Sequence, residues 1–183
     1  GFKWVSRVPG LIFGFEEALG YLVHPQVVRD KDGISASADA IAMARECKSR
    51  GIDLWGLLDE ASERFGHFAS SQITVRLTSM ADATDLSTKI RQDPPVQFGT
   101  RTIATAKDLA EPGVAEVPAN VLRYDLADGS RVMIRPSGTE PKLKVYLDTF
   151  SDDGTASERR AAASAALAEL ESDVQAFLEA LQA

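Results

Sequence analysis

Residues 132–145 of the 183-residue chain read VMIRPSGTEPKLKV, and this stretch decides how the C-terminal part folds. Val132 and Ile134 alternate with a methionine and an arginine before the loop, and Leu143 and Val145 alternate with lysines after it. Because successive side chains of a strand point to opposite faces, both flanks are predicted to be strands with one apolar face. The core faces are therefore assigned without using the loop between the strands.

Further elements are predicted upstream of this stretch. Residues 121–126 and 131–135 flank the sequence Ala-Asp-Gly-Ser, which is typical of a β-hairpin. Residues 72–77 alternate between apolar and polar side chains, which predicts another strand. Residues 86–92 are predicted to form a short helix that ends at Asp-Pro-Pro.

The last predicted element is a long helix that begins with a capping box. Thr155 and the glutamate three residues later, Glu158, have the spacing of that motif. Apolar residues at helical spacing follow, from Leu167 to Leu181. The order of strand, helix, paired strands, strand and long helix predicts an α+β fold, with an antiparallel sheet that has helices packed on one face.

The N-terminal part has a different character. Residues 1–35 are rich in glycine, proline and aromatic residues and are expected to form loops and short strands. Ser35 or Ser37 is expected to cap a helix that stops at Gly51, and a second helix is expected after Asp53.

A domain boundary is predicted near residue 70, where the helical pattern ends and the strand pattern begins. The predicted domains are residues 1–70 and residues 71–183. The two tryptophans, Trp4 and Trp55, are expected to be packing residues.

The amino-acid composition limits the kinds of partner that the protein is expected to bind. The formal net charge is −7, which argues against nucleic acid as the main partner and requires an anion site to be a local island of positive charge. No apolar run is long enough to span a bilayer, so no membrane partner is expected. The single cysteine, Cys47, fits a reducing cytoplasm. His24 and His67 are isolated in the sequence, so no metal site is expected here.

The loop in the opening stretch concentrates hydrogen-bond donors. Arg135 can offer a planar fork to two phosphate oxygens, and Ser137 and Thr139 add hydroxyls. Gly138 can take a positive φ and bring neighbouring backbone N–H groups onto a common point, as in an anion-binding nest. An ordinary tight turn with a solvated arginine fits the same spacing about equally well.

The sequence Arg-Pro-Ser-Gly-Thr-Glu-Pro, followed by a strand containing Lys-Val-Tyr, resembles the signature of the α-D-phosphohexomutases, which include phosphoglucomutase and phosphomannomutase. This resemblance implies that Arg135, Ser137, Gly138 and Thr139 bind the phosphate of the substrate that is not transferred. It also implies that the chain is a C-terminal fragment. Its first predicted domain is then part of the α/β third domain of the family, and its second is the fourth domain.

A second loop, residues 14–20, reads GFEEALG and resembles the sugar-binding loop of the third domain, usually written Gly-Glu-x-Ser. The resemblance implies that Glu16, with its neighbour Glu17, binds sugar hydroxyls. The sequence departs from the family at Phe15, where glycine is usual, and at Ala18, where serine is usual. Without the resemblance, two solvated glutamates would be the simpler reading.

Lys31 lies in the sequence Arg-Asp-Lys-Asp-Gly. This segment does not fit a calcium loop, because the twelfth position from Asp30 is Ile41 rather than glutamate. It resembles the Lys-Asp-Gly segment of phosphoglucomutases, which implies that Lys31 reaches the substrate and aids proton transfer or binds electrostatically. A lysine between aspartates keeps its charge, so electrostatic contact is favoured.

The resemblance also implies a mechanism for the complete enzyme. A phosphoserine exchanges phosphate with a hexose monophosphate through a bisphosphate intermediate, with Mg²⁺ as cofactor and hexose 1,6-bisphosphate as activator. The phosphoserine motif and the Asp-rich magnesium loop do not occur in this sequence. The chain alone is therefore expected to be inactive, and its partners are expected to be a hexose phosphate and the N-terminal domains. A phosphopentomutase, a sugar-bisphosphate synthase and a non-catalytic phosphate-binding module remain alternatives, and the sequence leaves the oligomeric state open.

Overall fold

The computed structural model describes residues 2–16 and 19–182. The chain divides into two compact units, Gly1–Leu58 and Asp59–Ala183, and the division falls inside helix α3 (Leu54–Phe65). The two units are described separately below. The domain boundary at residue 70 stays a prediction.

The first unit contains a small two-stranded sheet. Strand β1 (Gly14–Glu16) pairs antiparallel with β2 (Gly20–Leu22), so that Glu16 lies opposite Gly20. A short helix, α1 (Phe2–Val5), precedes the sheet, in a region where the sequence predicted only loops and short strands. Leu22 is fully buried, but few other large apolar side chains of this unit are.

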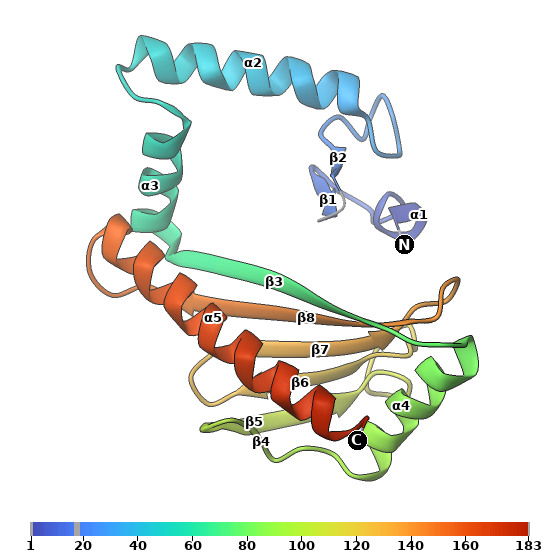
Figure 1. Ribbon diagram of the computed structural model, residues 1–183. Coiled ribbons are helices and arrows are strands. Elements are labelled where there is room, and N and C mark those ends of the chain that lie inside the picture. The colour runs from blue at the N-terminus through green and yellow to red at the C-terminus, as the bar shows by residue number, and fades with distance from the viewer. Residues whose placement is uncertain (1, 17–18, 183) are drawn as a thin grey trace. The chain divides into compact units, whose positions relative to one another are not determined.

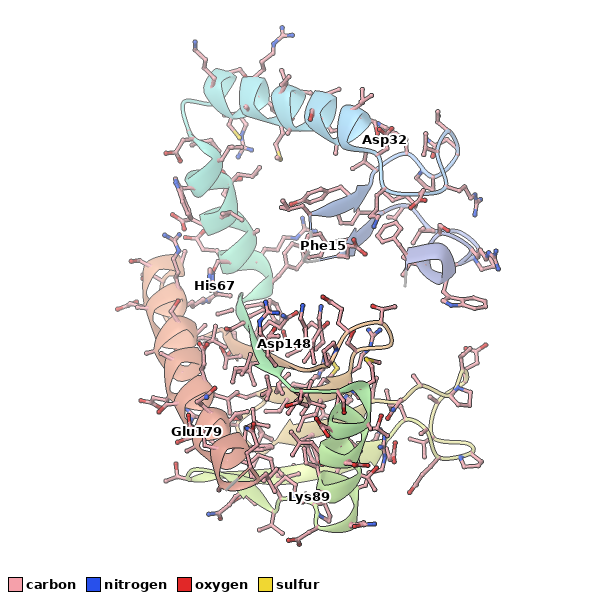
Figure 2. The ribbon with its side chains drawn as sticks, turned by 45° about the vertical axis from the view of Figure 1, so that its right-hand side comes forward. Phe15, Asp32, His67, Lys89, Asp148 and Glu179 are labelled. Atoms are coloured by element: carbon pink, nitrogen blue, oxygen red, sulfur yellow. The ribbon has the colours of Figure 1, made fainter. Side chains whose placement is uncertain are left out.

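Helix α2 (Gly33–Ser49) begins one turn earlier than the sequence predicted. Its N-cap is Asp32, labelled at the start of the helix in Figure 2, whose carboxylate accepts hydrogen bonds from the backbone N–H groups of Ile34 and Ser35. A carboxylate both caps these N–H groups and interacts favourably with the positive end of the helix dipole, which explains why it replaces Ser35 or Ser37 as the cap. The predicted stop is confirmed, since Gly51 follows the helix with a φ of 73°.

The second unit is built on a six-stranded antiparallel sheet with the strand order β3-β8-β7-β6-β5-β4. The strands are β3 (His67–Arg76), β4 (Gln97–Phe98), β5 (Arg101–Asp108), β6 (Leu122–Leu126), β7 (Arg131–Pro136) and β8 (Lys142–Ser151). Helices α4 (Met80–Gln92) and α5 (Ala156–Ala180) cover the same face of this sheet (Figure 1). The predicted α+β fold is confirmed.

The core lies between this sheet face and the two helices. The predicted inward residues of β7 and β8 are all fully buried, namely Val132, Ile134, Leu143, Val145 and Leu147. They pack in one cluster with residues of α4 and α5, including Leu86, Ile90, Leu170, Val174 and Leu178. At about 25 cal/mol per Å² of buried apolar surface, this cluster is the main stabilising contribution to the second unit.

Both helices of the second unit begin with a capping box. The predicted box of α5 is confirmed, since Thr155 and Glu158 bond each other's backbone N–H groups. The box of α4, formed by Ser79 and Asp82, was missed, and the helix starts at Met80 rather than residue 86. The part of α4 before residue 86 reads Met-Ala-Asp-Ala-Thr-Asp and is exposed except for Ala83, so it lacks the repeated large apolar side chains that reveal a helix.

Three further sequence predictions need correction. Strand β3 begins at His67 rather than residue 72, and strand β5 was not predicted at all. Most side chains of β5 are exposed, so the apolar alternation that reveals a half-buried strand is missing. Trp4 and Trp55 are not buried in a core, because 60% and 63% of their surfaces are exposed.

Candidate phosphate-binding site

The loop at residues 137–141 joins β7 to β8 at one edge of the antiparallel sheet. The backbone N–H of Ser137 donates to the carbonyl of Lys142 over 2.8 Å, which closes the base of the loop. Leu77 N–H, beyond the end of β3, donates to the Pro141 carbonyl over 2.9 Å. The loop is therefore anchored on both sides by strands whose opposite face is the core.

Arg135 lies at the end of β7 and is exposed. Within residues 2–16 and 19–182, its guanidinium makes no hydrogen bond or ion pair. Other arginines of the second unit are engaged: Arg131 bonds Asp125 over 3.1 Å, and Arg101 contacts three carboxylates. Because the fork of Arg135 is unoccupied by protein, it is available to an anion from solvent.

The hydroxyl groups of the loop lie close to Arg135 in the sequence. Ser137 accepts a weak hydrogen bond of 3.4 Å from the backbone N–H of Thr139 through its Oγ atom. This contact keeps the loop compact between the two strands. Both side chains are at least partly exposed, so their hydroxyl groups can reach a ligand at the surface.

Gly138 does not adopt the positive φ that a glycine at this position could take. Its backbone lies outside the left-handed region. A Cβ atom built on Gly138 would meet no atom within 4 Å. The packing of the protein itself therefore does not require glycine at this position, and open space lies above it.

Two further cations that the sequence analysis did not assign lie beside Arg135. Lys144 is directly opposite Arg135 on β8, and Arg76 on β3 is directly opposite Lys142. Strand alternation places all four side chains on the face of the sheet away from the helices. The alternation of Lys142 and Lys144 with buried residues was visible in the sequence, but the neighbouring Arg76 could be found only from the strand register.

One carboxylate reaches into this group of cations. The Lys142 Nζ atom donates to Glu140 Oε1 over 2.7 Å. This hydrogen bond is the main cause that holds the pKa of the Glu140 carboxyl below its usual value, and the charges of Lys142, Arg76 and Lys144 act in the same direction. The edge of the sheet at the loop is thus positively charged on a protein whose net charge is −7.

The first unit brings together two of the predicted sugar-binding residues. The Lys31 Nζ atom donates to Glu16 Oε1 over 2.9 Å, and both side chains are partly exposed. Gly20, opposite Glu16 on β2, allows this contact. A Cβ atom at Gly20 would lie 2.4 Å from Glu16 Cγ and 2.5 Å from Lys31 Cδ, closer than real atoms approach.

The ion pair fixes the charge state of Lys31. The hydrogen bond that Lys31 donates to Glu16 and the negative charge of Glu16 raise the pKa of Lys31 above its usual value, with a smaller contribution from the charge of Asp30. The ammonium group also lies 5.9 Å from the centre of the Phe2 ring. Lys31 is therefore a cation at neutral pH and a poor general base in this arrangement.

The predicted residue Glu17 lies outside the described residues, as does Ala18. The next residue, Leu19, has a φ of 60° although it is not glycine, and 82% of its surface is exposed. A leucine in the left-handed region is unfavourable, and such strain concentrates at functional sites. Leu19 thus places an unfavourable backbone conformation next to β2, close in sequence to Glu16.

The described residues contain no group of three or more His, Cys, Asp or Glu side chains that could hold a metal ion. Of the two histidines, His24 bonds Asp39 over 3.3 Å at the surface. Within residues 2–16 and 19–182, no helix is both long and apolar enough to cross a membrane.

Comparison with known proteins places these features in a family. Residues 100–176, which include the loop, match the family model described as phosphoglucomutase/phosphomannomutase, C-terminal domain. A probable phosphomannomutase of Haemophilus influenzae is 40% identical over 159 residues, covering 87% of this chain and 32% of that protein. The chain belongs to the phosphoglucomutase/phosphomannomutase family.

Two other comparisons agree with this family. A phosphoglucomutase of Staphylococcus epidermidis is 32% identical to this chain, over 83% of this chain and 31% of that protein. The solved structure of the open form of parafusin, a phosphoglucomutase of Paramecium, shares the fold with a TM-score of 0.59 and 18% identity, over 96% of this chain and 33% of that one. The chain spans about a third of the length of these relatives.

Proposed function

We propose that this chain is the phosphate-binding and sugar-binding part of a phosphohexomutase that moves a phosphoryl group between the 1- and 6-positions of a hexose phosphate. In this proposal the transfer runs through a phosphoserine and a bisphosphate intermediate, and parts of the enzyme outside this chain supply the serine. The observation that best supports the proposal is the exposed guanidinium of Arg135, unpaired within residues 2–16 and 19–182, beside a loop with two hydroxyls.

The loop suits the phosphate that stays on the sugar during each step. Arg135 would hold two oxygens in a bidentate contact, and the hydroxyls of Ser137 and Thr139 would donate to the others. The open space at Gly138 lets the anion approach the backbone closely. These groups would contact the phosphate and not the sugar, so the same loop can hold a hexose phosphate by its 1-phosphate or by its 6-phosphate.

Sugar contacts are proposed for Glu16, Glu17 and Lys31. A carboxylate accepts hydrogen bonds from two neighbouring hydroxyls and thereby fixes the orientation of a sugar ring. Lys31 contributes its positive charge, because the ion pair with Glu16 keeps it protonated. Its proposed role is electrostatic and does not include removal of a proton.

Magnesium and hexose 1,6-bisphosphate belong to the proposal for the complete enzyme. The described residues do not offer a metal site, so no step is assigned here to a metal held by this chain. The other domains of the enzyme would hold Mg²⁺ near the phosphoserine. A cytoplasmic location is proposed as well, since the single cysteine, Cys47, is free and buried.

A second candidate is a family member with another substrate, such as a phosphopentomutase or a sugar-bisphosphate synthase. The observation that favours it is the departure of the sugar-binding loop at Phe15 and Ala18 from the usual hexomutase sequence. Assay of the full-length enzyme with the 1-phosphates of glucose, mannose and ribose separates these candidates. A non-catalytic phosphate-binding module is the third candidate, and a full-length enzyme that turns over none of these substrates would favour it.

The phosphate site is tested by replacing Arg135 with glutamine and titrating inorganic phosphate by NMR. Hydrogen bonds to charged groups contribute about 1.5–3 kcal/mol, so the affinity of Arg135→Gln is expected to fall about 10- to 100-fold. The matched control is Arg131→Gln, four residues earlier on the same strand and the same face, because Arg131 is already bonded to Asp125. Equal affinity of the two variants would refute the proposed site.

The fragment proposal has its own test. The chain alone is expected to bind phosphate weakly and to show no mutase turnover, because catalysis of phosphoryl transfer requires the phosphoserine and the metal as well as positioning. Full turnover by the chain alone would contradict it. This assay is independent of the Arg135 titration, so either can fail without the other.

A further inference from the structure

Four cations surround the phosphate loop and are here named the basic cluster: Arg76, Arg135, Lys142 and Lys144. Lys144 lies opposite Arg135, and Arg76 lies opposite Lys142, on three neighbouring strands. Side chains directly opposite on antiparallel strands have Cβ atoms about 4.5–5.5 Å apart, and like charges in these positions are destabilising. The second unit therefore keeps two repulsive cross-strand pairs side by side.

Glu140 is the counter-charge of this cluster. Its carboxylate bonds the Lys142 ammonium over 2.7 Å, and the charges of Arg76 and Lys144 also lower its pKa. The other three cations make no ion pair with any residue in the described part of the chain. Glu140 thus supplies negative charge to a cluster that otherwise contains only repulsion.

The backbone of the loop places Glu140 beside Lys142. The Lys142 N–H donates to the Glu140 carbonyl over 2.7 Å, and the Pro141 carbonyl between them accepts from the Leu77 N–H. The proline ring restricts the chain further, because its φ is fixed. Glu140 is therefore held at the cluster by the same loop that carries Ser137 and Thr139.

We propose that Glu140 is a built-in counter-ion, which occupies the basic cluster electrostatically while the loop is empty and competes with phosphate for it. This inference rests on the proposed phosphate site and adds a device that weakens it. A phosphate dianion at the loop would approach a carboxylate two residues from Gly138 and would share its cations. Removing the charge of Glu140 should therefore destabilise the empty protein and strengthen anion binding.

Removing the charge of Glu140 is expected to raise the affinity for phosphate and to lower the unfolding temperature of the phosphate-free protein. Exposed charge pairs contribute little each, so Glu140→Gln is expected to bind inorganic phosphate about 2- to 5-fold more tightly than the unmodified protein. The same variant should unfold at a lower temperature in phosphate-free buffer, because the like-charge pairs lose their counter-charge. Saturating phosphate should remove this difference in unfolding temperature.

The control for net charge is Glu179→Gln, which removes one negative charge on α5, at the helix-covered face of the sheet (Figure 2). It should change neither the affinity for phosphate nor the dependence of the unfolding temperature on phosphate. A second variant, Lys142→Met, removes the direct partner of Glu140 and should weaken phosphate binding. Together the variants separate a local counter-ion from a general effect of charge.

Several results would overturn the proposal. Weaker phosphate binding by Glu140→Gln would mean that Glu140 positions Lys142 for the ligand, and unchanged binding would mean that it has no electrostatic role. An unfolding temperature unaffected by the substitution would refute the counter-ion in the empty state. If Glu140→Gln is tighter but Arg135→Gln in the same background has no effect, the phosphate lies elsewhere in the cluster, and the proposed loop site fails while the counter-ion stands.

Discussion

The phosphate loop and the Glu16–Lys31 pair lie in different compact units and are built in opposite ways. The loop joins two strands whose inner face is fully buried, and its principal cation, Arg135, has no partner in the described part of the chain. Glu16 lies on a three-residue strand of a small sheet, and its carboxylate is already bonded to Lys31. The phosphate loop thus has a well-packed support and an unpaired cation, whereas the Glu16–Lys31 pair has a small support and charges that already neutralise each other.

This difference indicates how each site is made specific. A rigid loop with unpaired donors loses little entropy when it receives an anion, so its affinity can come from a few contacts. A satisfied ion pair must exchange one partner for a sugar hydroxyl, so it gains little affinity but can discriminate between orientations. We therefore expect the loop to determine affinity for phosphate and the Glu16–Lys31 pair to determine selectivity for the sugar.

The largest expected effect concerns the support of the loop. Leu143 is fully buried and lies opposite both Pro136 and Val75, directly below the loop. Leu143→Ala should lower the free energy of unfolding by about 2–5 kcal/mol, as other buried leucines do. Urea denaturation measures this change, and Val117→Ala, at a side chain that is 72% exposed, should cost almost nothing. Similar losses for both variants would mean that the core under the loop is not the support.

The next largest effect concerns the Glu16–Lys31 pair in the first unit. Gly20→Ala would place a Cβ atom 2.4 Å from Glu16 and 2.5 Å from Lys31, so the ion pair must open. We expect about a tenfold loss of affinity for a hexose phosphate, as for the loss of one charged hydrogen bond, and no change for inorganic phosphate. The control is Gly33→Ala, where a Cβ atom meets nothing within 4 Å. Equal losses for inorganic phosphate and hexose phosphate would remove the division of labour between the sites.

A smaller effect tests the open space at the loop. Gly138→Ala should leave stability unchanged or raise it by up to about 1 kcal/mol, because the position has no positive φ and no close neighbour. Phosphate affinity should nevertheless fall severalfold, because the added methyl group occupies space that the anion needs. Gly129→Ala, at a φ of 85°, should instead destabilise the protein and leave phosphate binding intact. Unchanged phosphate affinity for Gly138→Ala would show that the anion does not approach the loop there.

Much of this architecture could be predicted from the sequence because it repeats a simple pattern. The alternation of Val132, Ile134, Leu143 and Val145 identified two central strands and their buried face. Thr155 identified the start of the last helix, since its capping box is a local motif. The elements that were missed, such as β5, have exposed side chains on both faces and so lack a hydrophobic period.

The candidate site was predicted only in part for a different reason. Arg135 and its loop are contiguous in the sequence, so their donors could be recognised together. Arg76 joins them through the register of β3 with β8, which no local pattern encodes. The partnership of Lys31 with Glu16 likewise depends on a contact across 15 residues. The backbone conformation at Gly138 could not be predicted, because glycine permits a positive φ without requiring it.

The last expected effect appears only at high pH, where it distinguishes the two units. Burial raises the pKa of Tyr124, in the core of the second unit, to about 12. Because its pKa in the unfolded chain is about 10, its contribution to stability is complete below pH 10 and is lost as the pH rises towards 12. The exposed pair in the first unit raises the pKa of Lys31 and acts in the same direction, but more weakly. Unfolding followed between pH 9 and 12 should therefore show a loss of stability that Tyr124→Phe largely removes and Lys31→Met reduces only slightly. The reverse ranking would mean that the exposed Glu16–Lys31 pair is held more rigidly than its small sheet suggests, and the contrast between the two sites would have to be abandoned.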